Sequence, residues 1–164
     1  MAYTFRGGIH PGTKNDPGFK AATNKKPIEV LKAPDKVILP VSMHIGAPAK
    51  PLVKKGDIVN MGQMIAEAGG FVSAPVHASV SGKVVDVVPM LHQNGSKVLS
   101  IVIENDHEDR LDESVKPKDF EAMSNDERIQ AIWDAGIVGH GGATFPTHVK
   151  IKSGIGKCDT ILIN

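Results

Sequence analysis

Short apolar runs separated by turn residues fill the middle of the chain, between about residues 36 and 104. The runs cover residues 37–39, 52–53, 58–59, 64–66, 76–81, 83–88 and 98–103. Turns are marked by Gly56-Asp57, Gly62-Gln63 and the pair Gly69-Gly70. Closely spaced short strands with frequent turns are typical of a small barrel or sandwich. We therefore predict a compact β module over residues 37–105, with no helix longer than two turns between Leu52 and Ile103.

The pattern changes to a helical period after a polar break at residues 105–110. Ser124 with Glu127 forms a capping box, and Ile129, Ile132 and Trp133 follow on one helix face. Gly136 is placed to end this helix. A second helix is predicted from about residue 146 to residue 152, stopping near Gly154.

Residues 160–163 read as an apolar, β-branched strand that needs a sheet to join. One such strand cannot make an α/β domain, so we interpret residues 106–164 as the beginning of one and the chain as the N-terminal portion of a longer protein. The predicted class is thus α+β. Residues 1–36, rich in proline and glycine, are predicted to form an extended arm with one short strand at residues 28–31.

Composition narrows the possible functions. The net charge of +1 gives no support for a nucleic-acid partner. The sequence contains no apolar run long enough to predict a membrane span. The single cysteine, Cys158, excludes an internal disulfide or a cysteine-ligated cluster within these residues and fits a reducing, cytoplasmic setting. Lysines dominate residues 14–55, and acidic residues dominate residues 106–127. These segments are either two solvated faces or a docking surface for a charged protein partner.

The richest candidate site is the stretch Gly139-His140-Gly141-Gly142-Ala143-Thr144-Phe145-Pro146-Thr147-His148-Val149-Lys150. Its glycines leave the backbone bare, and Pro146 suits the first turn of a helix. Free N–H groups at a helix start attract anions, and Lys150 adds a positive charge. The pattern indicates a phosphate cradle, although it matches neither the Walker A loop nor the dinucleotide fingerprint. The alternative is a glycine-rich connection between two helices.

The β region resembles the biotinyl/lipoyl type of barrel-sandwich hybrid. The likeness lies in Val53-x-x-Gly56-Asp57-x-Val59-x-x-Gly62-Gln63-x-Ile65, then Ala74-Pro75, then Ser81-Gly82-Lys83-Val84. Carrier domains of that fold present a modified lysine on the hairpin between the two halves. Residues 66–73 contain no lysine here, and Lys83 falls inside the next strand. The resemblance therefore implies the fold without the covalent cofactor.

Several ordered motifs along the whole chain resemble the C subunit of the Rnf electron-transport complex. They include Phe5-Arg6-Gly7-Gly8-Ile9-His10-Pro11, His44-Ile45-Gly46-Ala47-Pro48 and Ser73-Ala74-Pro75-Val76-His77. The glycine stretch also resembles the flavin-binding loop in the NADH-oxidising subunit of respiratory complex I. This resemblance implies a peripheral subunit on the cytoplasmic side of the membrane. Such a subunit passes electrons between NAD(H) and ferredoxin through FMN and 4Fe-4S clusters, within an ion-translocating complex that contains other subunits.

The resemblance also nominates site residues. It places Gly139, Gly141, Gly142, Ala143 and Lys150 at the FMN phosphate, Asn164 at the flavin and Phe145 against NADH, or in the core. His140 and Ser153 depart from the complex I pattern. Thr144 replaces a glycine, so we expect its φ to be negative. Iron–sulfur clusters are expected only beyond residue 164.

No side chain is nominated as catalytic, because the flavin carries the chemistry, and no histidine spacing indicates a metal site. This chain alone is expected to be inactive. Two other classes stay open: a biotin or lipoyl carrier domain, and a non-catalytic docking module such as the related subunit of the sodium-pumping quinone reductase.

Overall fold

The computed structural model describes residues 20–160, which fall into two units that meet between Lys32 and Ala33. In the first unit, residues 20–25 form a turn closed by the Asn24 N–H on the Lys20 carbonyl at 2.8 Å. The strand predicted at residues 28–31 is absent, and Ile28 and Val30 are 98% and 95% exposed. Strand propensity alone could not form it, because among residues 20–160 no neighbouring strand supplies hydrogen bonds to this segment. Residues 1–19, including the Phe5–Pro11 motif, and 161–164 lie outside the described part.

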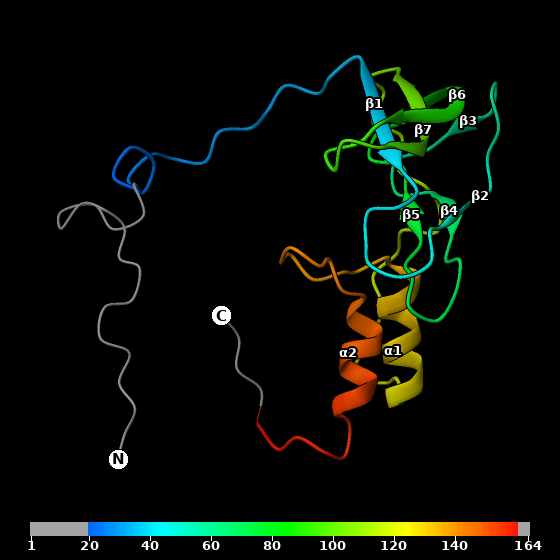
Figure 1. Ribbon diagram of the computed structural model, residues 1–164. Helices are drawn as coiled ribbons and strands as arrows, with labels where there is room; N and C mark the ends of the chain where they lie inside the picture. Colours follow the sequence, from blue (N-terminus) through cyan, green and yellow to red (C-terminus); the bar gives the residue numbers. More distant parts are fainter. Residues whose placement is uncertain (1–19, 161–164) are drawn as a thin grey trace. The chain divides into compact units, whose positions relative to one another are not determined.

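The second unit begins with β structure, drawn in cyan to green in Figure 1. A four-stranded antiparallel sheet has the order β1-β7-β6-β3, and a three-stranded sheet has the order β2-β4-β5. The strands are β1 (Lys36–Pro40), β2 (Lys50–Pro51), β3 (Ile58–Val59), β4 (Met64–Glu67), β5 (Val76–His77), β6 (Gly82–Leu91) and β7 (Lys97–Asn105).

One apolar core lies between the strands of these sheets. Ile65, Val84, Ile101 and Ile103 are each 0% exposed within it. The side chains are aliphatic, because the chain offers few aromatic residues. Alternation in β7 sends Ile101 and Ile103 inward, and β6 pairs with it along its whole length. The prediction that residues 52–103 hold no helix is confirmed.

Two helices follow the β structure and lie side by side in Figure 1, in yellow and orange. Helix α1 (Asn125–Asp134) has the predicted capping box: the Ser124 hydroxyl accepts from the Glu127 N–H, and the Glu127 carboxylate accepts from the Ser124 N–H. Gly136 ends this helix with a φ of +67°. Helix α2 (Thr147–Gly154) agrees with the predicted second helix.

Three expectations need correction or lie out of reach. The run 52–53 is not a strand, since β2 occupies the two residues before it. Thr144 has a φ of +43°, so a non-glycine residue adopts the left-handed conformation that we expected it to avoid. The strand predicted at residues 160–163 lies almost wholly outside the described residues. Residues 106–160 therefore show two helices and no strand of the predicted α/β domain. None of the helices in the described part is both long enough and apolar enough to span a membrane.

Candidate functional site

The glycine loop, defined here as residues 139–146, closes on itself as a narrow hairpin between α1 and α2. The Gly139 N–H donates to the Phe145 carbonyl at 2.9 Å, and the Thr147 N–H donates to the Ile137 carbonyl at 3.1 Å. An isolated antiparallel bridge joins Val138 to Pro146. The base of the loop is therefore held by its own backbone, and only its tip is open.

The tip of the glycine loop is turned but not packed. The Thr144 N–H donates to the Gly141 carbonyl at 3.0 Å, which fits the positive φ of Thr144. A Cβ placed on Gly141 or Gly142 would meet no atom within 4 Å. These glycines leave room above the backbone rather than allowing close internal packing. Within residues 20–160, no hydrogen bond uses the N–H groups of residues 140–143.

Helix α2 begins directly after the loop and presents free donors. Pro146 is its N-cap and supplies no side-chain hydrogen bond. The N–H groups of His148 and Val149 have no acceptor in the described part of the chain. Lys150 is exposed, and its Nζ lies 3.8 Å from the position that a Cβ on Gly139 would occupy. Free loop amides, free helix amides and one lysine ammonium thus occur together along residues 140–150.

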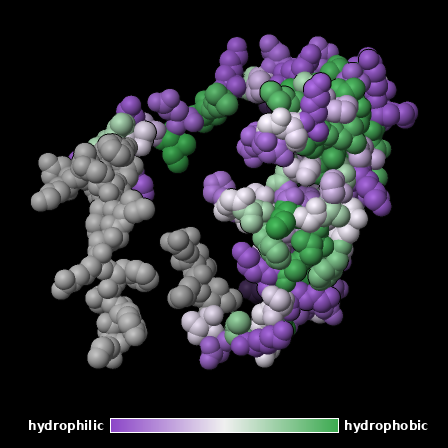
Figure 2. Space-filling model, in the orientation of Figure 1, coloured by the Kyte–Doolittle hydropathy of each residue, from purple (hydrophilic) through white to green (hydrophobic). Residues whose placement is uncertain are grey.

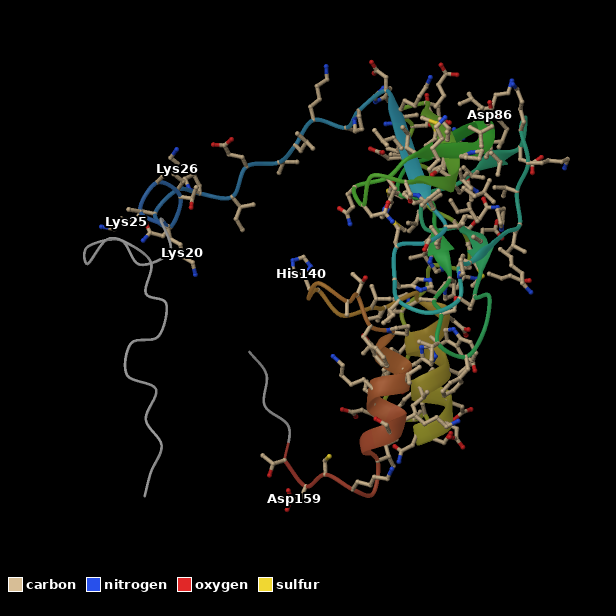
Figure 3. The ribbon with its side chains drawn as sticks, in the orientation of Figure 1. Lys20, Lys25, Lys26, Asp86, His140 and Asp159 are labelled. Atoms are coloured by element: carbon tan, nitrogen blue, oxygen red, sulfur yellow. The ribbon has the colours of Figure 1, made fainter. Side chains whose placement is uncertain are left out.

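The residues that the sequence singled out lie in different parts of the site. Gly141, Gly142 and Ala143 lie at the open tip of the loop. Lys150 lies beside Gly139 at the base, where the Gly139 N–H is already bonded to the Phe145 carbonyl. Phe145 is half-buried, and Asn164 lies outside the described residues. His140 is exposed and points away from the helix pair at the loop tip (Figure 3). Ser153 faces its own helix, because its hydroxyl donates to the Lys150 carbonyl at 2.7 Å.

The glycine loop and α2 also contact residues of the β structure and α1, and the sequence pattern did not predict these contacts. Ile45 donates its N–H to the Ala143 carbonyl at 3.3 Å, which ties the glycine loop to the β structure. His148 is 1% exposed and donates from Nε2 to the Phe71 carbonyl at 3.0 Å. Its ring stacks on Trp133 at a centroid distance of 4.5 Å. These partners are far apart in sequence and follow no period, so no local pattern could have indicated them.

Phe71 belongs to the β4–β5 connection, residues 68–75, which corresponds to the lysine hairpin of carrier domains. Here the connection is fastened to residues 44–48. The Ala47 N–H donates to the Val72 carbonyl at 3.0 Å, and the Ser73 hydroxyl donates to the Ala47 carbonyl at 2.8 Å. The Ala74 N–H donates to His44 Nε2 at 3.1 Å. The connection has neither the lysine nor the freedom that a carrier hairpin needs.

Electrostatic shifts near the helix pair are local. Burial lowers the pKa of His77 and outweighs the opposing effect of its contact with the Asp134 backbone and charge. His77 lines a pocket of about 790 Å³, together with Met64, Ile132 and Ile137. The described residues contain no group of three or more histidine, cysteine or carboxylate side chains arranged for a metal ion.

Two short-stranded sheets around one aliphatic core, with a fastened connection in place of a lysine hairpin, define a barrel-sandwich hybrid that is followed by a glycine loop and a helix. Residues 3–108 match the sequence profile of the RnfC barrel sandwich hybrid domain, and the chain belongs to this family.

Named relatives extend the match beyond the β module. The chain is 52% identical over 149 residues to the C subunit of the Na⁺-translocating ferredoxin:NAD⁺ oxidoreductase complex of Acetobacterium woodii, which covers 90% of this chain and 32% of that protein. It is 47% identical over 152 residues to the proton-translocating counterpart of Clostridium ljungdahlii, covering 92% of this chain and 32% of the relative. It is 36% identical over 164 residues to the C subunit of the ion-translocating oxidoreductase complex of Serratia proteamaculans, covering 99% of this chain and 22% of the relative. The chain therefore spans a third or less of the length of each of these proteins.

Proposed function

We propose that this chain provides the β module and the FMN phosphate cradle of a subunit that passes electrons between NAD(H) and ferredoxin. The subunit works in an ion-translocating membrane complex, on its cytoplasmic side. Support comes from membership of the RnfC family and from relatives that are named as subunits of such complexes. FMN, NAD(H), ferredoxin, iron–sulfur clusters and the other subunits of the complex all belong to this proposal.

The observation that carries the proposal is the set of free donors along the glycine loop and the start of α2. Four successive loop amides and two helix amides lack acceptors among residues 20–160, and Lys150 Nζ stands beside Gly139. A phosphate group offers the acceptors and the negative charge that such donors complement. The open space above Gly141 and Gly142 gives a phosphate room to approach the backbone. The residues present therefore fit the phosphate end of FMN.

Each part of the site has a separate task. In this proposal the loop amides and Lys150 hold and orient the phosphate, and half-buried Phe145 either contacts the nicotinamide nucleotide or packs in the core. When bound, FMN supplies the hydride and single-electron chemistry, so no side chain has to act as acid or base. The remainder of the flavin site, including Asn164, lies outside the described residues.

Replacing Lys150 with alanine in the full-length protein tests the proposal. We expect FMN to bind about tenfold to a hundredfold more weakly, because a charge-assisted hydrogen bond contributes about 1.5–3 kcal/mol. Flavin fluorescence titration measures the dissociation constant. Lys152→Ala is the matched control, since Lys152 is an exposed lysine on the same helix, further along the chain from the loop. Unchanged FMN binding by Lys150→Ala would refute the placement of the phosphate and favour a docking module without a cofactor.

A further inference from the structure

The β4–β5 connection contains the strongest unexplained arrangement in the molecule. In carrier domains this position presents a lysine to other proteins. Here residues 68–75 are fastened on one side to residues 44–48 and contact α2 on the other, through Phe71 and His148. Figure 1 shows the same neighbourhood, with the ends of the three-stranded sheet next to the helix pair. The connection therefore lies between the β module and the proposed phosphate cradle.

Close backbone approach fixes the connection on the β-module side. A Cβ on Gly69 would stand 2.0 Å from the Pro48 carbonyl oxygen, and a Cβ on Gly46 would stand 2.0 Å from the Val72 carbonyl oxygen. A real Cβ cannot stand so close to an oxygen, so both positions require glycine. The Gly69 N–H also donates to the Ser73 hydroxyl at 2.9 Å, and that hydroxyl donates onward to Ala47. The connection is consequently a rigid support rather than a mobile arm.

On the other side, His148 links the β4–β5 connection to the first turn of α2. Its Nε2 donates to the Phe71 carbonyl at 3.0 Å, and the Phe71 ring meets the His148 ring edge-on at 6.0 Å. Trp133 stacks on a face of the imidazole, with an angle of 8° between the rings. His148 Nδ1 and Trp133 Nε1 are buried without a hydrogen-bond partner in the described residues, so Nε2 makes the one directional contact of this imidazole.

We propose that the β4–β5 connection is a brace for the FMN cradle, with His148 as the positioning residue. The His148–Phe71 hydrogen bond fixes the first turn of α2, and the Ile45–Ala143 hydrogen bond fixes the loop tip. The free amides of residues 140–143 and 148–149 then keep one mutual arrangement. A preorganised set of donors binds a phosphate more tightly, because ordering costs are not charged to binding. The inference rests on the proposed FMN function and explains why the barrel-sandwich module is present without a carrier lysine.

Apolar side chains are partly exposed where the brace meets the helices. Figure 2 shows hydrophobic surface between the β module and the helices, and Ile45 and Phe71 are 50% and 57% exposed. Both residues reach the cradle through their backbone atoms, Ile45 through its N–H and Phe71 through its carbonyl. Substitutions of these two side chains therefore leave the bracing hydrogen bonds available. For this reason the decisive variants are at His148.

The test compares His148→Leu with His148→Gln in the full-length protein, at a temperature well below unfolding. Leucine removes the donor to Phe71, whereas the glutamine amide can place an N–H where the imidazole Nε2 lies. We expect His148→Leu to weaken FMN binding about tenfold, which equals about 1.4 kcal/mol, and His148→Gln to stay within about threefold of the parent protein. Hydrogen exchange of residues 139–150 should rise in His148→Leu and not in His148→Gln.

Ile103→Val controls for stability alone, because Ile103 is fully buried in the four-stranded sheet and makes no contact described for the brace. It should lower the unfolding midpoint and leave FMN affinity and exchange of the glycine loop unchanged. If Lys150→Ala weakens FMN and His148→Leu does not, the brace is wrong and the cradle stands. If Lys150→Ala has no effect, the FMN site itself is wrong. Equal losses in His148→Leu and Ile103→Val would show that only global stability matters, and would overturn the brace.

Discussion

Gly46 and Gly56 have the same backbone conformation in different surroundings. Both have a φ of +99°, where any L side chain is strained. A Cβ on Gly46 would stand 2.0 Å from the Val72 carbonyl oxygen, whereas a Cβ on Gly56 would meet nothing within 4 Å. Gly46 is therefore needed for space as well as for its φ, and Gly56 only for its φ.

Alanine at each position separates these two requirements. We expect Gly56→Ala to lower the free energy of unfolding by about 1–2 kcal/mol, the cost of a left-handed non-glycine residue. Gly46→Ala should cost about 2 kcal/mol more, because residues 44–48 must move away from the β4–β5 connection. Urea denaturation of the two variants measures the difference. Equal losses would mean that the connection yields easily, contrary to the close approach seen here.

Among the elements, α1 was predictable because its signals are local. A Ser–Glu capping box, an apolar face and a terminal glycine all lie within the helix or next to it, and each takes the predicted role. The strands at residues 58–59 and 64–67 were predictable for the same reason, as turn residues flank them. The strand prediction for residues 28–31 was wrong, because a strand depends on a partner strand and propensity does not reveal whether one is present.

The capping box predicts a defined response to pH. Hydrogen bonds from the Ser124 side chain and backbone hold the pKa of Glu127 below its ordinary value. A lowered folded-state pKa stabilises α1 fully above the unfolded value, near 4.5, and that contribution is lost as the pH falls through the folded-state pKa. Ser124→Ala should cost about 1 kcal/mol at pH 7, and less below pH 4.5.

Thermal unfolding of the parent protein and Ser124→Ala, followed from about pH 7 to pH 3, measures this response. Asp126→Asn is the control, since Asp126 lies in the same first turn but is not a member of the capping box. A difference between parent and Ser124→Ala that stays constant down to pH 3 would contradict the role given to Glu127.

Across the whole molecule, the sequence predicted the β module, both helices and the loop between them, since each depends on local periodicity and turn chemistry. It did not predict how the pieces meet. The loop is closed by a Gly139–Phe145 hydrogen bond, and the module reaches the cradle through Ile45 and Phe71. Each of these contacts uses a backbone group, which every residue type supplies, on at least one side, and only His148 contributes a side chain, so side-chain patterns do not reveal them. The same limit applies to Thr144, whose positive φ follows from its bond to Gly141.

The last prediction concerns how tightly residues 1–164 hold FMN without further protein. The cradle's loop amides, helix amides and Lys150 supply a few charge-assisted hydrogen bonds at about 1.5–3 kcal/mol each, and ordering costs remove part of that sum. About 3–5 kcal/mol remains, which corresponds to a dissociation constant on the order of millimolar. In the described residues these donors surround only the phosphate position, and tight binding also requires the isoalloxazine ring to be enclosed. Flavin fluorescence titration of this chain beside the full-length Acetobacterium woodii relative, of which it covers 32%, makes the comparison. We expect millimolar binding by the chain and much tighter binding by the relative, whereas submicromolar binding by the chain alone would mean that its own residues enclose the flavin ring.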